Sequence, residues 1–356
     1  MTVGCVVMVK MCVVRLSSLG DTVLVTPVLR ELRSRFPESH ITVLVKDEYA
    51  PVFENNPNVD HLFRVDVRGE HRGLWGLKRL VDELRRQEFD LFFDLHRNLR
   101  AWFITAGARA KRTFVYDKRR LHRLAMVYAK WLPVVSRHTV DLYFECVAPL
   151  GIDPAHRRPE VFLRDEEVVE AQLHLKKRGI DAESGPVGIH IGARGNAKRW
   201  SPIRFAHVAD ALAGRGLDAV IFCSDGDEPF VEEMCRAMRY TPTLVQRPPL
   251  RRLMALIDRC SVLLCHDSGP MHLAVARGVP VVALFGPTHP KLGFWPLGER
   301  DLVLTAEKQC SPCSLHGTKA CRRKVRECME MISEDRVLEA LVHSVCHRGD
   351  TAHVGS

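Results

Sequence analysis

The sequence predicts an α/β protein of two domains, each with a mostly parallel β-sheet covered by helices. Short apolar runs alternate with amphipathic helical stretches along nearly the whole chain, which is the pattern of repeated β–α units. This alternation stops between residues 151 and 185, where Gly151, Pro154 and Pro159 interrupt it, and then resumes. A chain of 356 residues is long enough to give each half a core of its own.

The first half alternates strands with helices. We expect strands at residues 3–16, 41–45, 62–67 and 91–95 and helices at residues 22–36 and 74–87. Pro27 lacks a backbone N–H and would be costly deep inside a helix, so the first helix should begin near it or kink there.

The second half repeats the pattern after a charged helix at residues 165–178. We expect strands at residues 187–191, 219–223, 260–265 and 279–285 and helices at residues 205–215, 229–238, 271–277 and 334–346. The predicted domains are residues 1–165 and residues 180–335. We expect the terminal helix, within residues 334–347, to pack back on the N-terminal domain.

The composition is that of a soluble globular protein, with 46% hydrophobic and 27% charged residues. No apolar run reaches the ~20 residues that a membrane-spanning helix needs. The apolar start contains Lys10 and Arg15 and has no small-residue cleavage site, so it predicts a buried strand and not an export signal. We therefore expect a cytoplasmic protein with reduced thiols.

The net charge of +9 is concentrated in one stretch. Residues 97–137 contain eleven Lys or Arg residues and a single acid, Asp117. A sign bias of this length favours an anionic partner, which can be nucleic acid, an acidic lipid surface, or a phosphorylated or carboxylated substrate. The alternative is a solvated basic surface without a partner.

The stretch CHDSGPMHLAVARGVPVVALFGPT, residues 265–288, predicts a strand, a turn, a helix and a second strand. Its polar turn follows the carboxyl end of a strand, where ligands bind in open α/β sheets. We expect Ser268 to cap the helix, and the backbone N–H groups behind it can hold a phosphate. His272 is either a phosphate ligand or a half-buried histidine. A capped helix with no ligand is the alternative for the whole turn.

Charged residues follow three other predicted strands. Asp21, in SSLGD, can accept a proton from a substrate hydroxyl, or it can simply favour the start of a helix. Lys198 and Arg199, in GARGNAKRW, stand beside a Gly-containing turn that a phosphate can approach, although the sequence has neither P-loop nor GxGxxG spacing. Glu228, in SDGDEP, can bind ribose hydroxyls or lie exposed at a helix start.

Four of the twelve cysteines cluster late in the chain. Cysteine side chains at this spacing are typical of a tetrahedral thiolate site for zinc, and the cluster consists of Cys310, Cys313, Cys321 and Cys328. Such a site would be structural, because four protein ligands leave no coordination position open for a substrate. Free thiols or disulfides are the alternative.

Together these motifs resemble glycosyltransferase family 9, the ADP-heptose:lipopolysaccharide heptosyltransferases. Three blocks carry the similarity, and in chain order they read RLSSLGDTVLVTPVLRELRSRFP, GARGNAKRWSPIRFAHVADAL and HDSGPMHLAVARGVPVVALFGPT. Smaller blocks, DLFFDLHRNLR, HTVDLYFECVAPLGI and CMEMISEDRVLEAL, extend the resemblance over nearly the whole chain. The four-cysteine segment and the extended N-terminus depart from the best-known members.

The resemblance implies the GT-B fold, in which two Rossmann-like domains face an interdomain cleft. The N-terminal domain would bind the acceptor and the C-terminal domain the nucleotide sugar. The reaction implied is an inverting transfer of heptose from ADP-heptose to a hydroxyl of the lipopolysaccharide inner core, with Asp21 as general base, Lys198 beside the donor diphosphate, and no metal required for catalysis. The implied donor-binding residues are Ser18, Gly20, Gly192, Lys198, Arg199, Glu228, Asp267, Ser268, Gly269, Pro270, Met271 and His272.

The implied acceptor is a lipid A and inner-core oligosaccharide with phosphates and acidic sugars, and this gives the basic stretch a partner. The expected acceptor-binding residues are Arg97, Asn98, Arg100 and Arg120. The enzyme would be peripheral on the inner face of the inner membrane, held by its anionic surface.

Two other hypotheses stay open at this point. One is another GT-B nucleotide-sugar transferase or a sugar-nucleotide epimerase. The other, more remote, is a zinc- and nucleic-acid-binding protein. With only 7% aromatic residues the chain lacks aromatic interleaving, and it has no recognisable nucleic-acid motif, so no nucleic-acid partner is expected.

Overall fold

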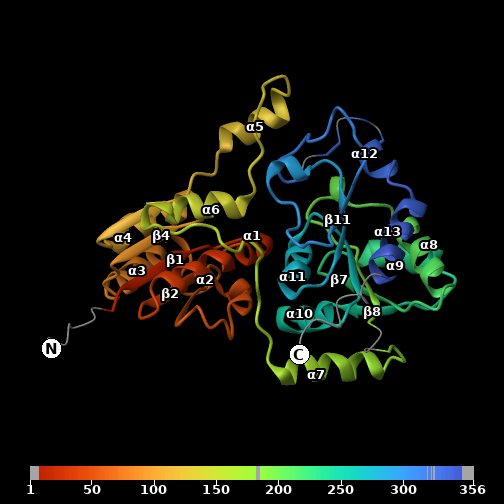
Figure 1. The fold of residues 1–356 in the computed structure, drawn as a ribbon, viewed down its shortest axis with the longest axis horizontal. Helices are drawn as coiled ribbons and strands as arrows, with labels where there is room; N and C mark the ends of the chain where they lie inside the picture. Colours follow the sequence, from red (N-terminus) through yellow and green to blue (C-terminus); the bar gives the residue numbers. More distant parts are fainter. Residues whose placement is uncertain (1–7, 182–184, 319, 322, 324, 347–356) are drawn as a thin grey trace. The chain divides into compact units, whose positions relative to one another are not determined.

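The computed structural model describes residues 8–181, 185–318, 320–321, 323 and 325–346 (Figure 1). The chain divides into two compact α/β units. The first unit comprises Met1–Arg120 and Thr139–Phe162, and the second comprises Leu121–His138 and Leu163–Ser356. Residues 121–138 therefore group with the second unit, whereas the predicted boundary placed them in the N-terminal domain.

The first unit contains a five-stranded parallel sheet in the order β3-β2-β1-β4-β5. Its strands are β1 (Lys10–Val14), β2 (His40–Lys46), β3 (His61–Val65), β4 (Leu91–Asp94) and β5 (Arg112–Val115). The chain runs from β1 outward to β3 and then returns to place β4 on the other side of β1, so the strand order reverses between β1 and β4. The carboxyl ends at such a reversal are the usual ligand site of an open α/β sheet.

Helices cover both faces of this sheet (Figure 1). The helices of this unit are α1 (Leu19–Val23), α2 (Thr26–Arg35), η1 (Asp47–Val52), α3 (Gly73–Arg85), α4 (Leu99–Ala108), α6 (Thr139–Val147) and η2 (Ala148–Leu150). The helix α5 (Arg120–Tyr128) begins at the last residue before the unit boundary and otherwise belongs to the second unit. The helices α3 and α4 pack against each other and against the side chains of Cys12, Val14 and Leu44. The helix α2 packs against α6.

Two expectations for the start of the chain can be compared with the structure. Pro27 lies in the first turn of α2, as its missing N–H requires, and residues 19–23 form the separate short helix α1. The first strand is shorter than predicted: β1 begins at Lys10, and residues 3–7 of the predicted strand lie outside the described residues.

The second unit contains a six-stranded parallel sheet in the order β11-β10-β9-β6-β7-β8. Its strands are β6 (Val187–His190), β7 (Ala219–Cys223), β8 (Thr243–Gln246), β9 (Val262–His266), β10 (Val281–Phe285) and β11 (Leu302–Thr305). Here the strand order reverses between β6 and β9, which places the second expected ligand edge at the carboxyl ends of these two strands.

The helices of the second unit form two layers. They are α7 (Asp165–Lys176), η3 (Asn196–Lys198), α8 (Pro202–Ala213), α9 (Glu228–Ala237), α10 (Leu250–Asp258), α11 (Gly269–Arg277), η4 (Pro290–Leu292), α12 (Glu327–Glu330) and α13 (Glu334–Cys346). The helices α8, α9 and α13 pack in one layer, and α7, α10 and α11 in the other.

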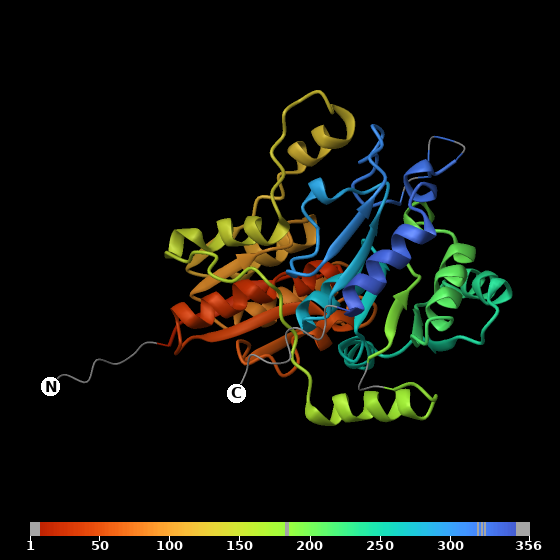
Figure 2. The same ribbon diagram turned by 45° about the vertical axis from the view of Figure 1, so that its right-hand side comes forward.

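The terminal helix α13 corrects one prediction. It lies along α8 in both ribbon views and packs against β9 and β10 (Figures 1 and 2). Its buried side chains Val337, Ala340 and Leu341 belong to the hydrophobic core of the second unit. The helix therefore completes the C-terminal domain, whereas we expected it to pack back on the N-terminal one.

Candidate functional site

The carboxylate of Asp21 lies at the carboxyl edge of the first sheet, in the short helix that follows β1. Arg15, the first residue after β1, approaches it with Nη2 at 2.6 Å from Oδ2. The same oxygen accepts hydrogen bonds from the hydroxyl of Ser18 at 2.9 Å and from the backbone N–H of Ser18 at 3.3 Å. Ser18 thus contacts the carboxylate, and Gly20 is buried inside α1.

The surroundings of Asp21 keep its carboxyl group ionised. Burial acts to raise its pKa, but the charge of Arg15 and the hydrogen bonds from Ser18 outweigh burial, so the pKa lies below the ordinary aspartate value. All of these contacts are made to Oδ2, so Oδ1 has no partner among the described residues. Asp21 is therefore a fixed anion with one oxygen available to accept a proton.

Arg15 and His96 also lie at this edge, although neither was predicted from the sequence as a site residue. Arg15 is 5% exposed, and its Nη1 donates to the carbonyl oxygen of Leu95, which follows β4, at 2.5 Å. This hydrogen bond links the Arg15–Asp21 ion pair to the end of β4, the strand beside β1 at which the strand order reverses. A cation directly after a buried strand, six residues before a carboxylate, is the sequence signal that could have found it.

His96 is a buried neutral imidazole at the same edge. Burial and then the charges of Arg15 and Lys118 lower its pKa to about 3. The Oδ1 of Asn98 accepts from the N–H of Ala101 at 2.8 Å, so its amide nitrogen faces His96 Nε2 at 2.7 Å. The network therefore assigns the ring proton to Nδ1, which is buried and has no hydrogen-bond partner among the described residues.

Of the other predicted acceptor-binding residues, Arg97 and Arg100 follow β4, whereas Arg120 begins α5. Arg97 forms an ion pair with Asp117 at 2.6 Å, and Asn98 caps α4. Arg100 donates to the carbonyl oxygen of His71 at 3.4 Å. Arg120 is exposed at the start of α5. Asn98 thus has a structural role in addition to its predicted one.

In the second unit, Lys198 and Asp267 come together at the carboxyl ends of β6 and β9. The Nζ of Lys198 lies 2.7 Å from Asp267 Oδ2 and 3.0 Å from the Asp267 carbonyl oxygen. An ammonium group has three N–H donors, so one of them has no partner among the described residues. This remaining donor can neutralise an anionic ligand at the edge of the sheet.

The segment that carries the late cysteines packs on the stem of Lys198. A Cβ atom at Gly317, which has a φ of +67°, would lie 2.5 Å from Lys198 Cε. The guanidinium of Arg326 donates to the carbonyl oxygens of Asn196 at 2.6 Å and Arg199 at 3.0 Å, on either side of the lysine. Gly317 and Arg326 therefore hold the Lys198 loop in place.

The turn after β9 leads into the helix α11 through Ser268. Ser268 takes the N-cap position of α11, but its hydroxyl donates to the carbonyl oxygen of His266 at 3.1 Å and does not cap the helix, contrary to expectation. The first N–H groups of a helix have no partner within it. Gly269 can supply such an N–H, whereas Pro270 has none, and the side chains of Met271 and His272 are buried.

The side chain of Arg199 is buried and forms an ion pair inside the second unit. Its Nη2 lies 2.7 Å from Asp227 Oδ1, and its guanidinium lies 4.3 Å from the centre of the Phe230 ring. Arg199 is 9% exposed and Asp227 only 2%. A Cβ atom at Gly192 would lie 2.3 Å from Asp227 Oδ2, so Gly192 leaves the space that this pair occupies. The contacts support a structural role for Arg199, and its predicted donor contact stays a prediction.

Replacing Arg199 by methionine is expected to lower the free energy of unfolding by about 3–5 kcal/mol, because the buried carboxylate of Asp227 would lose its cationic partner and keep only the N–H of Ser224 at 2.9 Å. Urea denaturation measures the change. The exposed pair Arg236–Glu232, at 3.2 Å within α9, is the matched control, and Arg236→Met should cost less than about 1 kcal/mol. Equal losses for the two variants would contradict the structural role.

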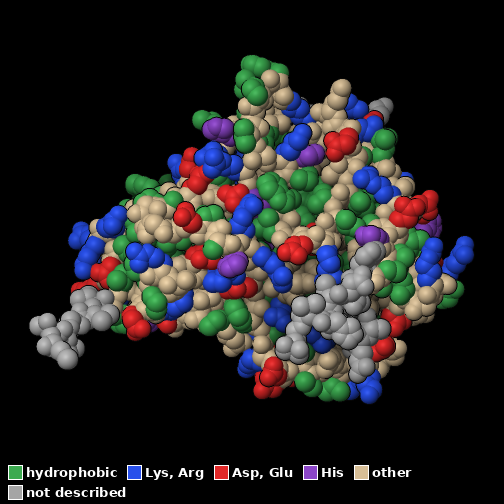
Figure 3. All heavy atoms as spheres, in the orientation of Figure 1, with side chains coloured by type: hydrophobic (Ala, Val, Ile, Leu, Met, Phe, Trp, Pro, Cys, Tyr) green, Lys and Arg blue, Asp and Glu red, His purple; other side chains and the backbone are tan. Residues whose placement is uncertain are grey.

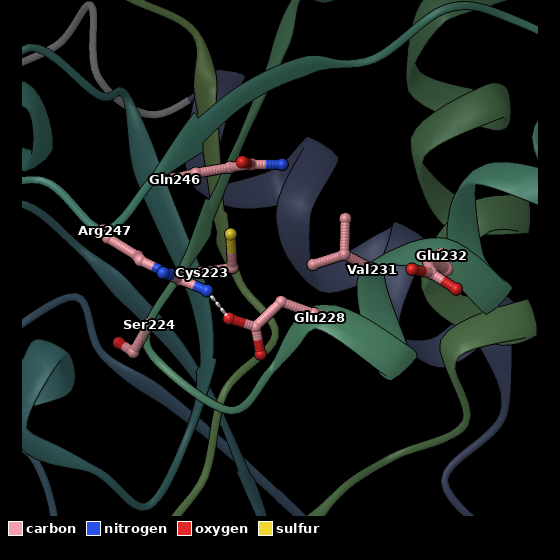
Figure 4. Close-up of a pocket in the computed structure, with 7 residues that line it drawn as sticks. All are labelled: Cys223, Ser224, Glu228, Val231, Glu232, Gln246 and Arg247. Atoms are coloured by element: carbon pink, nitrogen blue, oxygen red, sulfur yellow. Dashed lines mark hydrogen bonds and ion pairs between the residues drawn. The ribbon is translucent and has the colours of Figure 1, made fainter.

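Glu228 lines a pocket of about 130 Å³ at the carboxyl ends of β7 and β8 (Figure 4). Figure 4 shows its carboxylate pointing toward Arg247, with which it forms an ion pair, and Arg247 also contacts Asp225 at 3.0 Å. The pocket is completed by Cys223, Ser224, Val231, Glu232 and Gln246. A carboxylate and a guanidinium at the mouth of a small polar pocket suit a hydroxylated ring such as ribose.

The four late cysteines lie near one another. Burial and then the thiols of Cys313, Cys310 and Cys321 raise the pKa of Cys328 to about 11. However, the described part of the chain contains no group of three or more His, Cys, Asp or Glu side chains placed to hold a metal ion. Cysteine thiolates are suitable zinc ligands, but the four side chains are not placed as a zinc site in this structure. The zinc site therefore stays a prediction, which metal analysis of the purified protein can test.

Comparison with known proteins decides the family. The family model of glycosyltransferase family 9 (heptosyltransferase) matches residues 77–322. The chain belongs to glycosyltransferase family 9. The match includes Lys198, Glu228 and Asp267 and begins after Asp21.

Individual relatives agree with the assignment of this chain to family 9. The chain is 27% identical over 280 residues to lipopolysaccharide heptosyltransferase 3 of Escherichia coli (strain K12), covering 76% of this chain and 80% of that protein. A family 9 glycosyltransferase structure from Veillonella parvula DSM 2008 has a TM-score of 0.81 at 29% identity, covering 95% of this chain and 97% of that one. The ADP-heptose lps heptosyltransferase II of E. coli has a TM-score of 0.73 at 20% identity, covering 95% and 99%.

These likenesses confirm the predicted GT-B fold and a glycosyltransferase activity of the heptosyltransferase family. Within the described residues, no helix of this family 9 enzyme is both long and apolar enough to cross a membrane.

Proposed function

We propose that this enzyme transfers heptose from ADP-heptose to a hydroxyl of the lipopolysaccharide inner core, with inversion at the anomeric carbon. Membership of family 9 supports the two substrate classes, since its relatives are named as lipopolysaccharide heptosyltransferases. The observation that carries the mechanism is the Asp21 carboxylate, which is held ionised with one oxygen available.

Asp21 acts as the general base in this proposal. Arg15 and Ser18 hold Oδ2, so Oδ1 accepts the proton of the acceptor hydroxyl as that oxygen attacks the anomeric carbon. The new C–O bond forms on the face opposite the donor phosphate, and the bond to that phosphate breaks with its electron pair leaving on ADP. A single displacement of this kind inverts the anomeric configuration and needs no nucleophilic side chain.

The donor diphosphate lies, in this proposal, at the edge that carries Lys198 and the start of α11. In this proposal the remaining N–H donor of Lys198 and the free backbone N–H groups at the start of α11 stabilise the negative charge that develops on the leaving ADP. Asp267 orients the lysine through its 2.7 Å contact. Because these groups already supply positive charge, we propose that the reaction requires no metal. Ribose then occupies the pocket at Glu228.

The acceptor side is the first unit. Arg97, Arg100 and Arg120 supply positive charge for the phosphates and acidic sugars of the inner core. Because this acceptor is a membrane lipid, we propose that the enzyme works as a peripheral protein on an anionic membrane surface in the cytoplasm.

Thermal unfolding with nucleotides tests the donor assignment. ADP should raise Tm more than UDP or GDP, since a ligand at 100 times its Kd adds about 2.7 kcal/mol to the stability of the native state. Glu228→Gln should reduce the ADP shift, and Glu233→Gln, at an exposed position of the same helix that does not line the pocket, is the control. A larger shift with UDP or GDP would favour the alternative transferase or epimerase. Transfer from ADP-heptose to a core acceptor then tests the reaction itself.

A further inference from the structure

Residues 118–138 form a segment that we call the basic-aromatic segment. It contains α5 and the loop that follows it. Within it the sequence has no Asp or Glu. Its basic residues are Lys118, Arg119, Arg120, Arg123, Lys130 and Arg137. The segment therefore carries a high positive charge that no acid of its own offsets.

Large apolar side chains of this segment face solvent. Leu121 is 80% exposed, Trp131 81% and Val135 80%. Tyr128 and Leu132 are exposed as well, and Val127 is the buried residue of α5. Figure 3 shows hydrophobic side chains gathered at the place where Figure 1 labels α5. An apolar surface of this kind, bordered by charged residues, is typical of an interaction site.

The contacts that hold the segment to the second unit leave these side chains outside. Ser136 donates to the carbonyl oxygen of Lys291 at 2.7 Å, and Lys130 Nζ donates to that of Gln309 at 2.7 Å. The guanidinium of Arg123 lies 4.9 Å from the centre of the Phe294 ring. Because polar and cation–π contacts fix the segment, its exposed leucine, tryptophan and valine are not used for packing within the chain.

We propose that the basic-aromatic segment seats the enzyme on an anionic bilayer by inserting Leu121, Trp131 and Val135 among the lipid headgroups. The proposal rests on the proposed function, in which the acceptor is a membrane lipid. Tryptophan and aliphatic side chains beside Lys and Arg are the combination that binds at the membrane interface. The cations contact anionic headgroups, while the apolar side chains reach the start of the acyl chains.

A second copy of the chain is a poorer occupant. In a symmetric dimer the same patch meets itself. Arg119 pairs with Glu145 at 3.0 Å, but the other Lys and Arg residues of one segment would meet those of the second copy, and neither segment contains an acid. An anionic membrane satisfies the apolar and the charged side chains together.

The test is co-sedimentation of the full chain with vesicles of phosphatidylcholine, with and without phosphatidylglycerol. The double variant Trp131→Ser/Val135→Ser changes only the loop after α5. It should bind the anionic vesicles about tenfold more weakly or worse, because two apolar side chains no longer leave water. Pure phosphatidylcholine should bind the wild-type chain far less than the anionic vesicles.

The matched control is Val169→Ser/Leu173→Ser on α7. These side chains are 49% and 51% exposed at an i, i+4 spacing, but their helix carries the acids Asp165, Glu166, Glu167 and Glu170. This control should bind anionic vesicles like the wild type. Both double variants should keep the wild-type Tm. The single variant Trp131→Phe, which keeps an aromatic side chain and Val135, should bind anionic vesicles almost as strongly as the wild type.

Transfer to a deacylated, water-soluble acceptor separates this proposal from the proposed function. Lost vesicle binding with retained transfer to the soluble acceptor supports the membrane seat. If the wild type does not transfer heptose to this acceptor but binds vesicles as expected, the proposed function is contradicted and the proposed membrane binding is still supported. Unchanged vesicle binding of the Trp131/Val135 variant, an equal loss in the α7 control, or self-association that this variant abolishes would each overturn the proposal.

Discussion

Replacing Asp21 by asparagine is expected to slow heptose transfer by about 10³-fold, within the range of roughly 10²–10⁴ that a general base contributes. The amide keeps the size of the carboxylate but cannot take the proton of the acceptor hydroxyl. Initial rates of transfer with saturating ADP-heptose measure the effect. ADP binding, measured by its effect on Tm, should be unchanged, because the proposed donor site with Lys198 belongs to the second unit.

Asp60 offers the matched control for this variant. It also lies in the first unit, forms an ion pair with Arg33, accepts the N–H of Ile41 at 2.7 Å and has a lowered pKa. Asp60→Asn should therefore transfer heptose like the wild type. Turnover of Asp21→Asn close to that of Asp60→Asn would reject the base assignment.

The pH profile gives an independent check on Asp21. The base works only when it is deprotonated, and its pKa is lowered by Arg15 and Ser18 against the effect of burial. The rate should therefore not fall on the acid side until the pH drops below about 3.9, the ordinary aspartate value. The same lowered pKa adds stability that is present above that value and is lost as the pH falls through the pKa of the folded state.

Much of this site could be predicted because its residues follow buried strands. Asp21 and Lys198 lie in the loop or short helix that follows a run apolar on both faces, as strands of a covered parallel sheet must be. The edge strand β5 was missed for the opposite reason. Its residues RTFV are largely exposed and form no apolar run. Its pairing with β4 is made by backbone groups, which leave no pattern in the sequence.

The partners of the charged residues could not be predicted from local sequence. The Asp21 ion pair is set by Arg15, whose direction depends on the carbonyl oxygen of Leu95, 80 residues away. The apolar face of α13 predicted a helix, but its periodicity does not say which core receives Val337 and Leu341. Ser268 has the residue type of an N-cap, yet its hydroxyl donates a hydrogen bond to the carbonyl oxygen of His266 and does not cap the helix.

Replacing Lys198 by methionine is expected to lower kcat/KM by about 10²–10³-fold, as does the removal of one fixed donor from a site of developing charge. The loss should fall mainly on kcat, because the leaving diphosphate gains negative charge in the transition state, whereas ADP binding loses one contact among several. Steady-state kinetics with varied ADP-heptose separate the two. Lys308, which pairs with Glu327 at 3.0 Å in the same unit, supplies the control Lys308→Met.

The packing of Lys198 sharpens this prediction. Gly317 contacts the lysine stem so closely that a side chain there would displace it, so Gly317→Ala should reproduce part of the Lys198→Met defect without removing the charge. Asp267→Asn should do the same by releasing the ammonium group from its 2.7 Å contact. If both variants kept the wild-type kcat while Lys198→Met lost it, the charge of Lys198 would matter and its position would not. That outcome would contradict a preorganised site for the leaving ADP.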